Sequence, residues 1–118
     1  MRAPAQWILS AATLLLSACA AHTVVPSADE KLALTTTGKL RVAFLGNSAA
    51  QATKDPVTGE LKGPAVDVGR EMALRLGVPF EAVPYRAVTE LVASAPNDEW
   101  DVISIGINPD RQKLIDFA

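Results

Sequence analysis

The chain has 118 residues, enough for one small domain and too few for a two-domain enzyme. Hydrophobic residues make up 49% and charged residues 20%, which excludes a wholly disordered, collagen-like or coiled-coil chain. The net charge is −2 without any basic block, so we expect no nucleic-acid partner. With Cys19 and His22 as the only residues of their kinds, we expect no thiolate metal cage, no Cys/His catalytic pair and no cofactor.

The N-terminal residues are typical of an export signal. Arg2 precedes an apolar run from Trp7 to Ala21, and no acidic residue occurs before Asp29. The run is interrupted by serine and is shorter than the roughly 20 apolar residues that span a membrane, as signal peptides are. We therefore interpret residues 1–18 as a removable signal peptide and expect a periplasmic or cell-surface protein.

The residues at the end of this run, Leu16, Ser17, Ala18 and Cys19, resemble the lipobox of bacterial lipoproteins. In that motif the cysteine thiol receives a diacylglyceryl group, so we predict a lipid anchor at Cys19. The mature chain would carry ten cations and thirteen acids, a net charge of −3. The alternative is ordinary signal peptidase cleavage, because Ala18 and Ala20 also form an A-x-A pattern.

Residues 19–37 are predicted to form a tether and a short helix. Ser27 and Glu30 have capping-box spacing, and we expect Gly38 to end the helix. The apolar run from Lys39 to Leu45 then predicts a buried parallel strand. Turn-forming residues predict a loop with a hairpin-like turn up to Gly63.

Two helices and two further strands are expected beyond this loop. Pro64 suits the first turn of a helix that ends at Gly77. Its predicted core face consists of Ala65, Val68, Gly69, Met72, Ala73 and Leu76. Residues 78–85 predict a strand, residues 88–95 a helix that ends before Pro96, and residues 101–106 a third strand, with Met72, Phe80 and Trp100 as packing residues. This alternation predicts an α/β fold with a mainly parallel sheet flanked by helices.

In open parallel sheets, ligands bind outside the carboxyl ends of the strands. Residues 46–51 and 106–111 are the loops that qualify. Arg111 offers a planar guanidinium that fits a carboxylate; the alternative is an exposed arginine paired with Asp110 or Asp116. Asn47, Ser104 and Asn108 offer neutral hydrogen-bond donors and acceptors, and Gly106 lets the backbone approach a ligand closely. The alternative is that they are ordinary turn residues.

Three segments, LRVAFLGN, DPVTGELKGPAVDVGREMALRLGV and EWDVISIGINPDRQKLIDFA, resemble the N-terminal part of bacterial solute-binding proteins of family 3. The resemblance covers about residues 38–118. It implies one lobe of a periplasmic-binding-protein fold, in which two lobes close on a ligand. It also implies that Arg111 binds the ligand α-carboxylate, that Gly106 and Asn108 lie near the ligand ammonium, and that the partner is an ABC permease in the membrane.

The chain departs from the family pattern at two places. The loop before Arg111 is about two residues shorter than in the usual amino-acid binders, and Asn108 replaces an expected hydroxyl residue. The second lobe does not follow, so we expect an incomplete lobe and a truncated copy. No catalytic residue is predicted, and a periplasmic dehydratase-like enzyme or a solute-sensing domain on the same fold is the alternative.

Overall fold

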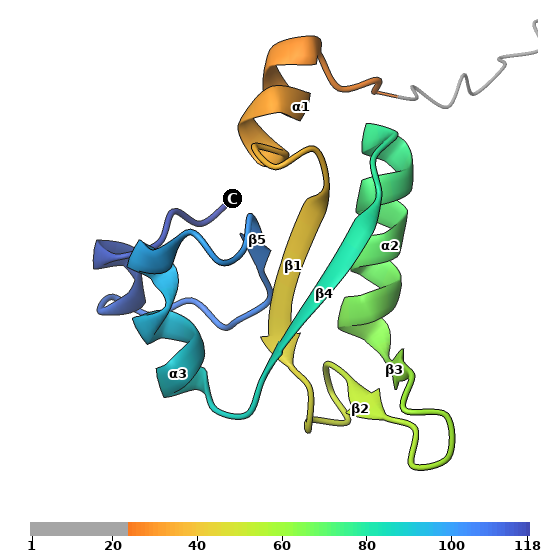
Figure 1. Cartoon of the computed structure of the whole chain (residues 1–118). Helices are drawn as coiled ribbons and strands as arrows, with labels where there is room; N and C mark the ends of the chain where they lie inside the picture. Colours follow the sequence, from red (N-terminus) through yellow and green to blue (C-terminus); the bar gives the residue numbers. More distant parts are fainter. Residues whose placement is uncertain (1–23) are drawn as a thin grey trace, which may run out of the picture.

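The computed structural model describes residues 24–118 (Figure 1). The predicted signal peptide, residues 1–18, and the predicted lipidation site, Cys19, lie outside the described residues. No helix among residues 24–118 is long and apolar enough to cross a membrane.

Helix α1 (Ala28–Leu34) begins with the predicted capping box. The Ser27 hydroxyl accepts from the Glu30 amide at 3.2 Å, and the Glu30 carboxylate accepts from the Ser27 amide at 2.8 Å. The helix ends before Gly38, where we expected its end. The Thr35 hydroxyl donates to the Lys31 carbonyl at 2.6 Å, occupying the acceptor that a further helical turn would use. Gly38 instead forms the following turn, with a φ of 79°.

A three-stranded parallel sheet forms the centre of the described chain, in the order β4-β1-β5 (Figure 1). Strand β1 (Leu40–Leu45) pairs with β4 (Phe80–Tyr85) along its whole length, from Leu40↔Phe80 to Leu45↔Tyr85. On its other side β1 pairs with β5 (Val102–Ile103) at two positions. The predicted α/β fold with a parallel sheet is therefore confirmed.

The segments between these strands have the predicted order. Strands β2 (Thr53–Lys54) and β3 (Leu61–Lys62) form the antiparallel hairpin. Helix α2 (Pro64–Leu76) follows and ends at Gly77, whose φ of 66° is the left-handed conformation expected at a helix C-terminus. Helix α3 (Val88–Ala93) is shorter than predicted, because a 3-10 turn, η1 (Ala95–Asn97), takes over where Pro96 cannot donate a helical hydrogen bond.

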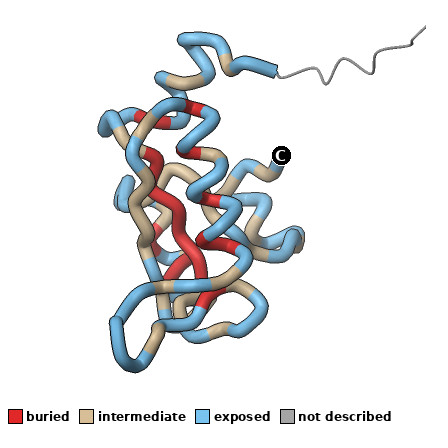
Figure 2. Tube along the Cα trace, turned by 90° about the vertical axis from the view of Figure 1, so that its right-hand side faces the viewer, coloured by how far each residue is buried: buried red, intermediate tan, exposed pale blue. Residues whose placement is uncertain are grey.

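The core lies where α2 packs on β1 and β4, as the buried positions in Figure 2 show. Its largest fully buried side chains are Phe44, Leu40 and Val66, and Leu91 of α3 is fully buried outside this cluster. The prediction that Val68 faces this core is wrong: its exposed fraction is 60%, whereas that of Val66 is zero. Val68 and Met72 instead line a hollow whose other wall includes Val102 and Ile103 of β5.

Candidate functional site

The loop that follows β5 brings three of the predicted site residues together. The Nη1 group of Arg111 donates a hydrogen bond to the Gly106 carbonyl at 2.6 Å, and the Arg111 amide donates to the Asn108 side-chain oxygen at 2.9 Å. Arg111 opens a single 3-10 turn, η2 (Arg111–Lys113), as its position after Pro109 and Asp110 suggests. The side chain and the backbone amide of Arg111 thus both form hydrogen bonds within the loop.

The guanidinium of Arg111 has no ion-pair partner among residues 24–118. Asp110, one of the two acids considered as its partner, pairs with Lys113 at 2.9 Å. Asn108 and Arg111 together line a hollow of about 370 Å³ whose opposite wall is α3, through Val88 and Val92. Asp110 lines the same hollow, so two charged side chains lie at the margin of a mainly apolar space.

The other two predicted residues lie in different places. Ser104 lines the hollow of about 350 Å³ between α2 and β5. Asn47 follows β1 and lines a third hollow, of about 370 Å³, where its side-chain amide donates to the Arg86 carbonyl at 3.2 Å. Gly106, Asn108 and Arg111 thus form one cluster, and Ser104 and Asn47 are not part of it.

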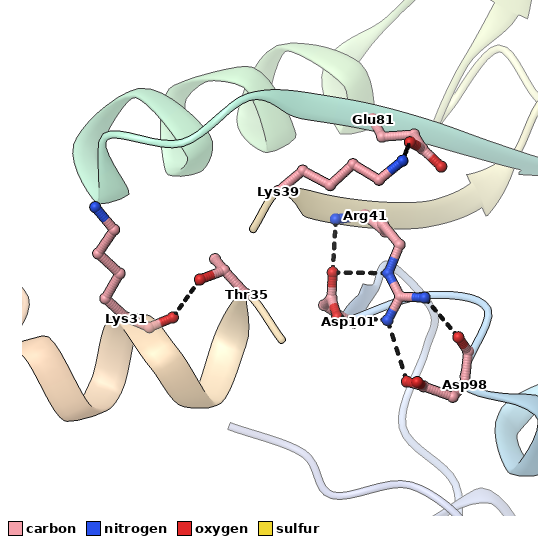
Figure 3. Close-up of polar contacts among 7 residues, drawn as sticks. All are labelled: Lys31, Thr35, Lys39, Arg41, Glu81, Asp98 and Asp101. Atoms are coloured by element: carbon pink, nitrogen blue, oxygen red, sulfur yellow. Dashed lines mark hydrogen bonds and ion pairs between the residues drawn. The ribbon is translucent and has the colours of Figure 1, made fainter. Parts of the chain in front are cut away.

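Sequence reasoning missed a buried charge cluster at the opposite end of the sheet (Figure 3). Arg41, the second residue of the otherwise apolar strand β1, is 7% exposed. Its guanidinium donates to the Asp101 carboxylate at 2.7 and 3.1 Å and to the Asp98 carboxylate at 3.1 Å. Its amide also donates to Asp101 at 2.8 Å, and the Asp101 amide donates back to the Arg41 carbonyl at 2.9 Å.

These contacts shift the protonation of both partners. The hydrogen bonds that the Arg41 side chain donates to Asp101 raise the pKa of Arg41, and burial only partly opposes this change. Burial alone would raise the pKa of Asp101, but the hydrogen bonds and the charge of Arg41 together hold it below its ordinary value. Both groups are therefore charged at neutral pH, and they attach the start of β5 to β1. The signal in the sequence was one arginine within a strand that is otherwise apolar, followed far along the chain by an aspartate directly before another apolar run.

A second polar network lies between β4 and η1. The Tyr85 hydroxyl donates to the Glu99 carboxylate at 2.7 Å, and the Trp100 indole donates to the Ser94 hydroxyl at 2.8 Å. Burial, with Glu99 beside it, raises the pKa of Tyr85. The hydrogen bond from Tyr85 in turn lowers the pKa of Glu99. Trp100 is half-buried, in agreement with its predicted packing role.

Comparison with known proteins identifies the family of this chain. The sequence profile of the bacterial extracellular solute-binding proteins, family 3, matches residues 40–118. The chain belongs to this family. Its members act outside the cytoplasm, and most of them bind solutes without acting as enzymes. A search of curated proteins found no significant match.

Two solved structures are similar to this family 3 chain. An ancestral cationic amino acid solute-binding protein shares 27% sequence identity with a TM-score of 0.59, over 68% of this chain and 35% of its own. An ancestral cyclohexadienyl dehydratase shares 28% identity with a TM-score of 0.60, over 76% of this chain and 36% of its own. The chain therefore spans about a third of the length of each. Among its residues 24–118, no group of three or more metal-ligating side chains occurs.

Proposed function

We propose that the chain is the extracytoplasmic solute-binding component of an ABC importer and binds a small carboxylate-bearing solute, such as an amino acid, through Arg111. The observation that carries the proposal is the position of this guanidinium, beside a hollow and without an ion-pair partner among residues 24–118. Membership of family 3 supports the same function.

The hydrogen bond to Gly106 suits Arg111 for this task. It uses one nitrogen, Nη1, and fixes the plane of the guanidinium. Within residues 24–118, Nε and Nη2 form no hydrogen bond and present the fork that matches two carboxylate oxygens. A charge-assisted hydrogen bond of this kind contributes about 1.5–3 kcal/mol. Binding of this kind neither makes nor breaks a covalent bond.

We also propose that the chain is exported and anchored to a membrane by a lipid. Residues 1–18 direct export, Cys19 carries the lipid, and the residues up to 37 connect the lipid to the lobe. The capped helix α1 lies at the amino-terminal end of β1 (Figure 1), whereas the loop that carries Arg111 follows the carboxyl end of β5. A lipid attached before α1 would therefore leave the carboxyl ends of the strands free to meet a solute and a permease.

A dehydratase-like enzyme is the second candidate, favoured by the similarity to the ancestral cyclohexadienyl dehydratase. Proton transfer to a bound solute needs an acid or base in a shielded position. The loops 46–51 and 106–111 contain a single acid, Asp110, whose side chain is 90% exposed and pairs with Lys113. This arrangement favours binding. A solute-sensing domain would use the same Arg111 contact without a permease.

The test is an NMR titration of the ¹⁵N-labelled chain with a panel of amino acids that includes arginine. We expect the amides of residues 106–114 to shift saturably, and Arg111→Gln to weaken binding about tenfold or more. Arg75→Gln is the matched control, because Arg75 is exposed on α2 and pairs with Glu71. Equal affinity of the Arg111→Gln and Arg75→Gln variants would refute the anchor, and conversion of the solute into a new species would favour the dehydratase.

A further inference from the structure

The hollow that Asn47 lines is formed by the carboxyl ends of β1 and β4 and by the β2–β3 hairpin; we call it the hairpin hollow. Its volume of about 370 Å³ is within the range of small-molecule sites. Three chain segments build it, through Gly46 and Asn47 after β1, Lys54 and Leu61 on the hairpin, and Pro84 and Arg86 at the end of β4.

Backbone contacts hold the walls of the hairpin hollow in place. The Gly46 amide donates to the Tyr85 carbonyl at 3.0 Å, and the Asn47 side chain donates to the Arg86 carbonyl at 3.2 Å. A Cβ atom at Gly46 would lie 2.8 Å from the Pro84 Cβ, so the two strand ends approach as closely as glycine permits. The backbone that carries Arg86 is therefore held by two hydrogen bonds from residues 46–47.

The charge of the hairpin hollow is the feature that points to a ligand. Lys54 and Arg86 line it, and none of its lining residues is acidic. The acids of the hairpin are engaged elsewhere: Asp55 and Glu60 pair with Lys62 at 3.4 and 3.5 Å, and Glu60 also pairs with Arg70 at 3.6 Å. Within the described part of the chain, neither Lys54 nor Arg86 forms an ion pair.

The remaining polar groups close to this hollow do not cancel its charge. The Tyr85 hydroxyl is directed to Glu99, and Glu99 also accepts from the Asn97 side chain at 2.9 Å. The whole chain has a net charge of −2, so two cations without an acid in one hollow differ from the rest of the molecule. Such a local positive potential attracts and orients small anions.

We propose that the hairpin hollow binds the oxyanion group, carboxylate or phosphate, of a small solute. Arg86 offers a planar fork to two oxygens, and Lys54 offers a mobile point charge from the opposite wall. The site is separate from Arg111, which lines a different hollow, so this proposal goes beyond the solute binding inferred above and does not depend on it.

The test is an NMR titration of the full chain with two probes, inorganic phosphate and succinate, at constant ionic strength. Gly59, in the turn of the hairpin, also lines the hollow. We expect saturable shifts of the Gly46, Gly59 and Arg86 amides with one or both probes. Lys54→Gln and Arg86→Gln should each weaken this binding about fivefold or more. A response to phosphate alone, to succinate alone or to both supports the site and identifies the group it takes.

Lys62→Gln is the matched control, because Lys62 belongs to the same hairpin but is occupied by Asp55 and Glu60. It should change the affinity less than about twofold, the range of an exposed ion pair. The proposal is overturned if neither probe gives a saturable shift, or if Lys62→Gln weakens binding as much as Lys54→Gln and Arg86→Gln. Lys54→Arg, which keeps the charge, should bind the probe, and this result separates loss of charge from loss of fold.

The Arg111→Gln variant distinguishes the two proposed sites. If it loses amino acid binding and retains binding of the probe anion, both sites stand. If probe binding survives while no amino acid binds the unmodified chain, the hairpin hollow stands and the solute proposal fails. Loss of probe binding in Arg111→Gln, with the amide dispersion of the folded chain preserved, would contradict the separation of the two sites.

Discussion

The two sides of strand β1 are held by different forces. On the β4 side, β1 pairs along its whole length, and α2 covers the pair with buried apolar side chains. On the β5 side, two residue pairs form the ladder, and the ion cluster of Arg41, Asp98 and Asp101 joins the start of β5 to β1. The comparison teaches that apolar burial specifies the first side and buried charge the second. The loop that carries Arg111 follows directly from the second.

Breaking the charge cluster should have the largest effect. Arg41→Met leaves Asp101, whose side chain is 5% exposed, without its partner. We expect the free energy of unfolding to fall by about 3 kcal/mol, because a buried charge without its partner is costly. Arg75→Met, which removes an exposed pair on α2, should cost about 0.5 kcal/mol or less. Urea denaturation measures both variants, and equal losses would contradict the account.

Crowding the β4 side should have a smaller effect. A Cβ atom at Gly69 would lie 2.7 Å from the Phe80 ring and 3.2 Å from a Val42 methyl group. Gly69→Ala therefore gains helix propensity but strains the packing of α2, and we expect a net loss of about 1–2 kcal/mol. Leu74→Ala, at a site 73% exposed on the same helix, should change stability by about 0.5 kcal/mol or less. A stabilised Gly69→Ala variant would show that this interface is loosely packed.

The pH dependence of stability tests the charge of Asp101 on the β5 side. The folded chain holds the pKa of Asp101 below its ordinary value. Its carboxylate therefore stabilises the fold above about pH 4, and this contribution is lost as the pH falls through the lower folded pKa. We expect Asp101→Asn to be less stable than the unmodified chain at pH 7, with the difference decreasing below about pH 4. A difference that does not change between pH 7 and pH 3 would contradict the role of this charge.

The contrast also explains which parts of the fold were predictable. Strand β1, helix α2 and its end at Gly77 follow from local patterns, since a buried strand is an apolar run and a left-handed helix end favours glycine. The third strand was expected over residues 101–106, but only Val102–Ile103 pair in the sheet. The Ser104 amide still donates to the Ala43 carbonyl at 3.1 Å, and the pairing then stops. An apolar run does not reveal how many of its residues have a neighbouring strand.

The candidate site was predictable in part for the same reason. The cluster of Gly106, Asn108 and Arg111 is local in sequence, so its residues were found together. Asn47 and Ser104 were expected beside them, but their final positions depend on contacts between distant segments, such as that of Asn47 with Arg86. The pairing of Arg41 with Asp101 spans sixty residues, and no local periodicity reports it.

The central claim, that Arg111 binds the carboxylate of a solute, is tested most directly by its own side-chain signal. In the ¹⁵N spectrum of arginine Nε–H groups, the Arg111 signal is the one missing from Arg111→Gln. We predict that this signal moves during the amino acid titration and saturates together with the amides of residues 106–114. A signal that stays fixed while those amides saturate would contradict the claim.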